Sequence, residues 1–210
     1  MAQDKSWLIF DGRNNPPIPD YNGPDYRFPI DLAEYVISRF CSEGGTVLDP
    51  FAGFGTSFLA ARALNRKCYG FEKDPKTYET ALKIIGDKPE TFINDSIQNV
   101  ENHGLEKADL IFTSPPYASF RGTQNDPEEI YFKDFEEIFL KLKNILKPTG
   151  KLVVEIANVH DNRGALPLAF IAALTLRKHY KFEYEIINCA AGNTDDGEHY
   201  DHSYILVFSA

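Results

Sequence analysis

The segment Thr113-Ser114-Pro115-Pro116-Tyr117 combines residue types that suit a planar ligand bearing an amino group. Two consecutive prolines cannot continue a central strand, and they stiffen the backbone while leaving carbonyl groups without intrachain donors. A serine hydroxyl and a fixed carbonyl can accept the two N–H bonds of an exocyclic amine, and the tyrosine ring can stack on the base that carries it. A plain proline turn uses the same residues, so this segment alone leaves both interpretations open.

A second segment, Asp49 to Thr56, has the sequence DPFAGFGT and follows a short apolar run typical of a buried strand. Gly53 and Gly55 allow a tight turn and a close approach of the backbone to a ligand. The N-terminus of the helix expected next offers unpaired N–H groups to a polar or anionic group. A tight strand–helix turn without a ligand also fits this segment. The chain contains neither GxGxxG nor GxxxxGK[ST], which disfavours a dinucleotide or nucleoside triphosphate site.

Acidic residues end the next two expected strands, Glu72 after the second and Asp95 after the third. A carboxylate in this place can accept hydrogen bonds from a ribose diol, as it does in nucleotide-binding folds. Taken singly, each residue is better explained as a helix cap or a solvated loop carboxylate. The functional interpretation depends on their combination with the two segments above.

These residues are positioned by apolar runs that alternate with helical periods, a pattern that predicts an α/β fold with a parallel sheet. Strands are expected at 46–50, 68–74, 90–95, 109–115, 151–158, 181–189 and 203–208, and helices at 31–40, 56–66, 75–85, 128–147 and 166–179. Residues 1–30 are expected to be irregular, and no change in composition marks a second domain. Loops after the carboxyl ends of parallel strands build the ligand crevice of such a sheet, which would bring the three groups of residues together.

The order and spacing of these segments resemble the S-adenosylmethionine-dependent amino-methyltransferases, specifically the DNA methyltransferases that modify cytosine N4 or adenine N6. DPFAGFGT is similar to their cofactor motif, GFEKDP to their ribose-binding segment, NDS (94–96) to the segment near the cofactor adenine, and TSPPY to their catalytic motif. Residues 27–30 with the following helix resemble the segment that packs over the methionine end of the cofactor. Residues 146–158 and 202–208 resemble the fifth and seventh strands of the fold. The resemblance covers residues 25–208 approximately.

The resemblance implies a Rossmann-like class I methyltransferase fold in a single domain over residues 1–210, with a mostly parallel seven-stranded sheet, an antiparallel last strand and helices on both faces. It implies S-adenosylmethionine as the cofactor. The implied cofactor-binding residues are Phe28, Asp49, Pro50, Phe51, Ala52, Gly53, Gly55, Thr56, Glu72, Lys73, Asp95 and Ser96, and the implied catalytic residues are Ser114, Pro115, Pro116 and Tyr117.

The implied reaction is a direct displacement in which an exocyclic amine attacks the sulfonium methyl group. Hydrogen bonds to the Ser114 hydroxyl and the Pro115 carbonyl would stabilise positive charge developing on the nitrogen. Tyr117 would stack on a base flipped out of its helix. Serine at position 114 is the form associated with cytosine N4, so the resemblance implies site-specific methylation of DNA cytosine, as in restriction–modification systems.

Two departures from the family's usual pattern concern the substrate. The cofactor motif precedes the catalytic motif, an order also found in RNA guanine-N2 methyltransferases, and no separate target-recognition domain is evident. An RNA or protein-amide methyltransferase, an adenine-N6 DNA methyltransferase and a cofactor-binding subunit of a larger complex therefore stay open as alternatives. Recognition would come from residues 1–25, from the loops at 117–127, 157–165 and 190–202, where Arg121 and Arg163 are the expected phosphate or base contacts, or from a partner subunit or second copy.

Composition constrains these alternatives. The 210 residues include 22 basic and 31 acidic side chains, and a net charge of −9 is unusual for a protein that binds nucleic acid by phosphate neutralisation alone. No run approaches the roughly 18 apolar residues of a membrane span, and the N-terminus lacks a secretory signal pattern, so we expect a cytoplasmic protein. His199, Asp201 and His202 lie in a segment typical of a solvated loop, and no metal site is expected.

Overall fold

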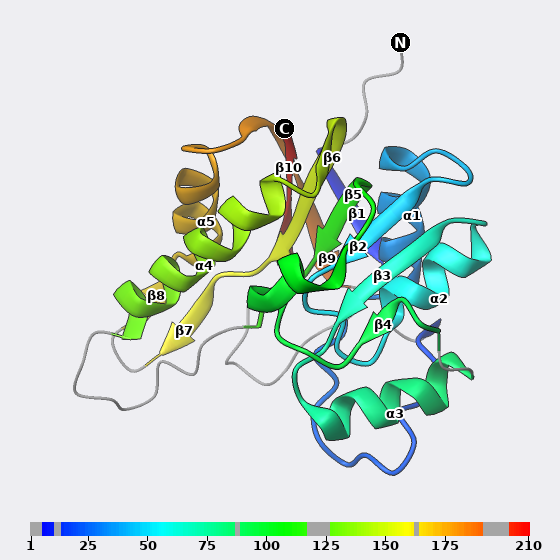
Figure 1. The fold of residues 1–210 in the computed structure, drawn as a ribbon. Coiled ribbons are helices and arrows are strands. Elements are labelled where there is room, and N and C mark those ends of the chain that lie inside the picture. Colours follow the sequence, from blue (N-terminus) through cyan, green and yellow to red (C-terminus); the bar gives the residue numbers. More distant parts are fainter. Residues whose placement is uncertain (1–5, 11–13, 87–88, 117–126, 162–163, 191–201) are drawn as a thin grey trace.

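A sheet of eight strands in the order β1-β9-β10-β6-β5-β2-β3-β4 forms the centre of the fold. The structure is a computed structural model and describes residues 6–10, 14–86, 89–116, 127–161, 164–190 and 202–210, except for the side chains of 127–129, 160, 161 and 190. Figure 1 shows the sheet between two layers of helices, with α4 and α5 on one face and α1 and α2 on the other.

The elements follow one another in the β-α-β succession that the alternating pattern predicts. The strands of the sheet are β1 Trp7–Phe10, β2 Thr46–Asp49, β3 Lys67–Phe71, β4 Phe92–Ile93, β5 Ala108–Thr113, β6 Leu146–Ile156, β9 Lys181–Ala190 and β10 His202–Ser209. The helices are α1 Ile30–Phe40, α2 Thr56–Ala63, α3 Pro75–Ile85, α4 Pro127–Lys143 and α5 Leu168–Leu176, with a 3-10 helix, η2, over Ile97–His103. The strands β7 Val159–Asp161 and β8 Gly164–Leu166 pair separately as a small antiparallel ladder.

The direction of the strands confirms the expected fold class. Strand β10 is antiparallel to both of its neighbours, β6 and β9, and every other pairing in the large sheet is parallel. This is the arrangement of a class I methyltransferase, with its antiparallel last strand.

Three sequence expectations about the elements are wrong. The loop expected at 157–165 contains β7 and the start of β8. Residues 7–10, expected to be irregular, form β1 and pair in parallel with β9, so the sheet has eight strands instead of seven. The helix expected to reach residue 147 ends at Lys143, and β6 begins at Leu146, so the Pro148–Gly150 turn signal lies inside a strand. For β1 and β6, pairing with a distant strand outweighs local sequence preferences.

Side chains on opposite faces of the sheet form two separate cores. Phe135, Phe139 and Leu142 of α4 pack with α5 against one face. Leu32, Val36 and Ile37 of α1 pack with α2 and α3 against the other. Because both faces are covered, the central strands are buried, and only their ends are left to form a site.

Candidate active site

Asp49, the last residue of β2, is the most deeply buried carboxylate of the predicted site, with 1% of its surface exposed. It accepts hydrogen bonds from Ser57 Oγ at 2.6 Å, from Thr113 Oγ1 at 2.7 Å and from the Phe51 backbone N–H at 3.1 Å. Burial raises the pKa of Asp49 to about 6, although the three hydrogen bonds favour the ionised form. This carboxylate therefore joins the DPFAGFGT loop, the first turn of α2 and the end of β5.

The loop between β2 and α2 has the backbone conformation that its glycines predict. Gly53 and Gly55 have φ values of +52° and +84°, in the left-handed region. A Cβ atom at Gly53 would meet no other atom within 4 Å, so the space beside this backbone is open. The Thr56 hydroxyl is buried and has no hydrogen-bond partner among the described residues. An open backbone beside an unpaired buried hydroxyl fits a polar ligand at the start of α2.

Glu72 lies one residue beyond β3 and contacts the same loop. Its carboxylate accepts a hydrogen bond from the backbone N–H of Asp74 at 2.7 Å, and the Gly53 N–H lies close enough to favour its ionised form. Burial raises the pKa of Glu72 above its usual range. The expected ribose-binding residue and the expected cofactor loop are therefore in direct contact. Lys73, the next residue, is exposed.

Asp95 takes part in a local network that the sequence analysis did not identify. Its carboxylate accepts hydrogen bonds from Asn99 Nδ2 at 2.8 Å and from the Ser96 N–H at 2.7 Å, and it pairs with His103 Nε2 at 2.9 Å. The His103 contact is the main cause of a lowered pKa at Asp95. Ser96 caps η2 by accepting a hydrogen bond from the Gln98 N–H. A contact between Asp95 and the cofactor adenine stays a prediction.

The segment expected to be catalytic begins where β5 ends. Thr113 is fully buried, Ser114 is half-buried, Pro115 is buried and Pro116 is exposed, so the chain passes from the core to the surface within four residues. Tyr117, Arg121 and Arg163 lie outside the described residues.

Glu155 of β6 is a residue of this region that the sequence analysis missed. It is 8% exposed, and the strand register places Ser114 and Ser203 beside it, where their hydroxyls favour its ionised form. Burial raises its pKa, whereas the two hydroxyls favour ionisation. The signal for this residue was a single glutamate within the apolar run LVVEIA, where a charged side chain is unusual without partners.

Other expected cofactor residues lie around the same strand ends. Pro50, Phe51 and Ala52 follow Asp49, and the Ala52 N–H donates to the Phe71 carbonyl at 2.9 Å. The Phe28 ring lies 4.9 Å, centroid to centroid, from the ring of Phe112, which precedes Ser114 by two residues. Phe28 is therefore close to the end of β5, and its expected contact with the cofactor stays a prediction.

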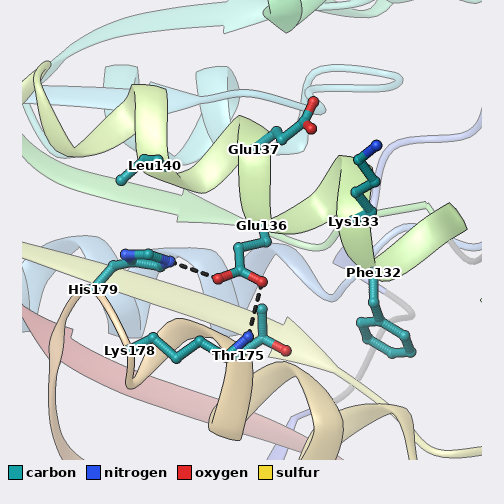
Figure 2. Close-up of a pocket in the computed structure, with 8 residues that line it drawn as sticks. All are labelled: Phe132, Lys133, Glu136, Glu137, Leu140, Thr175, Lys178 and His179. Carbon is teal, nitrogen blue, oxygen red and sulfur yellow. Dashed lines mark hydrogen bonds and ion pairs between the residues drawn. The ribbon is translucent and has the colours of Figure 1, made fainter. Parts of the chain in front are cut away.

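A surface pocket of about 510 Å³ lies elsewhere, between α4 and α5. Figure 2 shows Glu136 of α4 bonded to Lys178 and His179, at 2.9 and 2.7 Å. Because none of the residues that line this pocket comes from the predicted site, we assign no part of the chemistry to it. None of the described helices is long and apolar enough to cross a membrane, and the described residues contain no cluster of three metal-ligating side chains.

Comparison with known proteins identifies the family. The sequence profile of a DNA methylase family, the N6/N4 methyltransferases, matches residues 5–83 and 108–210. The type II methyltransferase M.HindIII of Haemophilus influenzae is 42% identical over 67 residues, which are 31% of this chain and 22% of that protein. The match therefore spans about a fifth of the length of this relative.

Solved structures show the same fold at low sequence identity. TrmN from Thermus thermophilus has a TM-score of 0.64 at 16% identity, covering 87% of this chain and 49% of that one. SMU.1697c from Streptococcus mutans, solved in complex with SAH, has a TM-score of 0.55 at 14% identity and covers 88% and 99% of the two chains. Together with the profile match, the fold shows that this chain belongs to the DNA methylase family of S-adenosylmethionine-dependent methyltransferases.

Proposed function

We propose that this chain transfers a methyl group from S-adenosylmethionine to the N4 amine of a cytosine in DNA. The observation that carries the proposal is the 2.7 Å hydrogen bond between Thr113 Oγ1 and Asp49 Oδ1. It joins the strand that ends in the catalytic motif to the residue that begins the cofactor motif. Ser114 follows Thr113 directly, so the segment assigned to the substrate begins one residue beyond this contact.

Binding of the cofactor is assigned to the loop from Asp49 to Thr56 and to Glu72. The Glu72 carboxylate lies near the Gly53 N–H of the loop and has further lone pairs to accept from a ribose diol. The open backbone at Gly53 and the unpaired Thr56 hydroxyl receive the polar end of the same ligand. When bound, S-adenosylmethionine supplies an electrophilic methyl group on a sulfonium.

Ser114 and Pro115 are assigned to the substrate amine. The Ser114 oxygen and the Pro115 carbonyl accept the two amine N–H bonds and orient the nitrogen lone pair toward the methyl group. The same two oxygens would stabilise the positive charge that develops on nitrogen as the N–C bond forms and the sulfonium S–C bond breaks to leave a thioether, after which the methylated nitrogen releases one proton to solvent. A base in a duplex must leave the stack to reach them. Serine at the first position of the motif favours cytosine N4 over adenine N6.

We assign recognition of a DNA site to residues outside the described part of the chain and to a partner subunit or second copy. The net charge of −9 leaves little general attraction for phosphate. We propose that Arg121 and Arg163 supply local phosphate or base contacts and that a partner subunit or second copy contributes to target recognition.

A methyl-transfer assay tests this proposal. Purified chain is incubated with labelled S-adenosylmethionine and, in parallel, with duplex DNA, single-stranded DNA or total RNA, and the nucleosides are resolved by mass. We expect N4-methylcytosine in DNA. N6-methyladenine would correct the base and retain DNA, whereas label confined to an RNA nucleoside would overturn the substrate class. Ser114→Ala is the control. It removes the proposed acceptor for the substrate amine and leaves the cofactor loop unchanged.

A further inference from the structure

Polar side chains from four neighbouring strands form a line on the face of the sheet that α1 covers. They are Ser114 beside the end of β5, Glu155 of β6, Ser203 of β10 and Asn188 of β9. Thr113 is in register with Val154, which places Ser114 next to Glu155 across the parallel pair, and Ser203 is in register with Asn188. Glu155, Ser203 and Asn188 are each at most 9% exposed, so this line is a buried extension of the site.

The donors and acceptors in this line determine which group each hydroxyl hydrogen can reach. Asn188 Nδ2 donates to Ser203 Oγ at 3.1 Å, so the Ser203 hydrogen is available for the Glu155 carboxylate. Ser114 is the second hydroxyl beside Glu155, placed there by the register of β5 and β6, and it too favours the ionised carboxylate. A carboxylate only accepts, so an ionised Glu155 takes the hydrogen of both serines. The Ser114 oxygen is then left with lone pairs alone for any other partner.

From this geometry we infer that Glu155 is a positioning residue for methyl transfer: its ionised carboxylate binds the Ser114 hydrogen and so turns the Ser114 lone pairs toward the substrate amine. The inference rests on the proposed role of Ser114 and adds the group that sets the direction of its hydroxyl. Within the described residues Glu155 forms no ion pair with a cation. Its negative charge is therefore not neutralised by a cation, and it also stabilises the positive charge that develops on the amine bound to Ser114.

The protonation state of Glu155 then controls whether Ser114 can accept a hydrogen bond from the substrate amine. Burial raises its pKa, so the carboxylate takes up a proton at a higher pH than an exposed glutamate does. A protonated Glu155 can itself donate a hydrogen bond to Ser114 Oγ. The Ser114 lone pair is then no longer available to accept from the substrate amine. We therefore expect kcat to fall as pH decreases through the pKa of Glu155.

Other ionisable groups near this line are distinguishable from Glu155. His202 and Tyr204 flank Ser203 in β10 and point to the opposite face of the sheet. Asp31 and Glu34 are carried by α1, the helix over this face. Asp49, two strands away from β6, has a raised pKa of its own. An acid limb due to any of these groups would persist when Glu155 is replaced.

A double-mutant cycle with pH profiles tests the inference. The variants are Glu155→Gln, Ser114→Ala and their combination, with Glu183→Gln as the matched control, since Glu183 pairs with Lys151 away from this line. We expect Glu155→Gln to lower kcat by at least tenfold in the wild-type background and by less than twofold in Ser114→Ala, with the Kd for S-adenosylmethionine unchanged. It should also remove the acid limb. An equal loss in both backgrounds, or an unchanged pH profile, would overturn the inference.

A second readout does not depend on turnover or on the identity of the base. Carbon-13 NMR titration of the Glu155 carboxyl should show a higher pKa in Ser114→Ala and in Ser203→Ala than in wild type, because each change removes a donor to the ionised form. Ser203→Ala should also move the acid limb of kcat to higher pH. If wild type labels no nucleic acid, the proposed function fails while this titration still reports on the contact. An unchanged Glu155 pKa in Ser114→Ala would show that Ser114 is not its partner and would overturn the inference.

Discussion

Thr113 and Asp49 lie 64 residues apart in the chain, and a 2.7 Å hydrogen bond joins their side chains at the centre of the sheet. Both residues are buried, and neither side chain contacts the surface. The segments proposed as the cofactor motif and the catalytic motif are therefore connected inside the protein, and a change at one should affect the other.

The buried carboxylate of Asp49 should make stability depend on pH. Its pKa is about 6 in the folded protein and about 4 in an unfolded chain, so between these values the folded state holds a proton that the unfolded state has released. Stability should therefore fall as pH rises from 4 to 6, by up to about 3 kcal/mol. Asp49→Asn should lack this decrease. Urea unfolding at pH 4, 5, 6 and 8 measures it, and parallel curves for the two proteins would contradict the assignment.

Ser114→Ala should separate chemistry from cofactor binding. Loss of one preorganised polar contact to the reacting amine lowers kcat by about 100-fold, by analogy with other sites of this kind. The Ser114 side chain does not belong to the cofactor loop, so the Kd for S-adenosylmethionine should stay within twofold of wild type. Single-turnover methyl transfer and calorimetric titration measure the two quantities. A folded variant that loses both equally would argue against this division of roles.

Gly55→Ala should destabilise the protein more than Gly44→Ala. Both glycines have positive φ, +84° and +73°, so both substitutions carry a backbone cost of about 1 kcal/mol. A Cβ at Gly55 would also lie 2.7 Å from Ile85 Cδ1, whereas one at Gly44 would meet no atom within 4 Å. We expect a further loss of about 1–3 kcal/mol at Gly55 from this overpacking. Equal unfolding free energies for the two variants would show that Ile85 moves aside freely.

Glu72→Gln should change stability and cofactor affinity in opposite directions. Because burial raises the pKa of Glu72, its ionised form is disfavoured in the folded state, and a neutral glutamine removes that cost. The same change weakens hydrogen bonds to a ribose diol, so the Kd for S-adenosylmethionine should rise about tenfold. The exposed Glu79 of α3 provides the control Glu79→Gln. A tighter or unchanged Kd in Glu72→Gln would remove Glu72 from the cofactor site.

The sequence predicted best those features that depend on neighbouring residues. Helix α3 begins and ends as expected, because Asp74 accepts from the Thr77 N–H, Pro75 opens the first turn and Gly86 adopts the left-handed conformation at its end. The loop after Asp49 follows in the same way from its glycines. These signals act within a few residues and can be read without knowing the fold.

Features that depend on distant partners were not predictable in this way. Strand β1 has four residues, and its pairing with β9 matches Trp7 with Ile187. The partners of Glu155, namely Ser114 and Ser203, are brought together only by the register of β5, β6 and β10. The pairing of Asp95 with His103 likewise requires the turn of η2. Charged residues in apolar runs are the signal that would have directed attention to Glu155.

The parallel pairing of β1 with β9 also has a consequence for the order of folding. The strand near the start of the chain cannot find its partner until residues beyond 180 have been synthesised. Contacts of such long sequence separation form slowly, because the closure of a long loop comes before the gain from pairing. During synthesis on the ribosome, β1 with Trp7 and Ile9 must therefore wait unpaired while β2 to β6 assemble, and closure of this side of the sheet is a late step of folding.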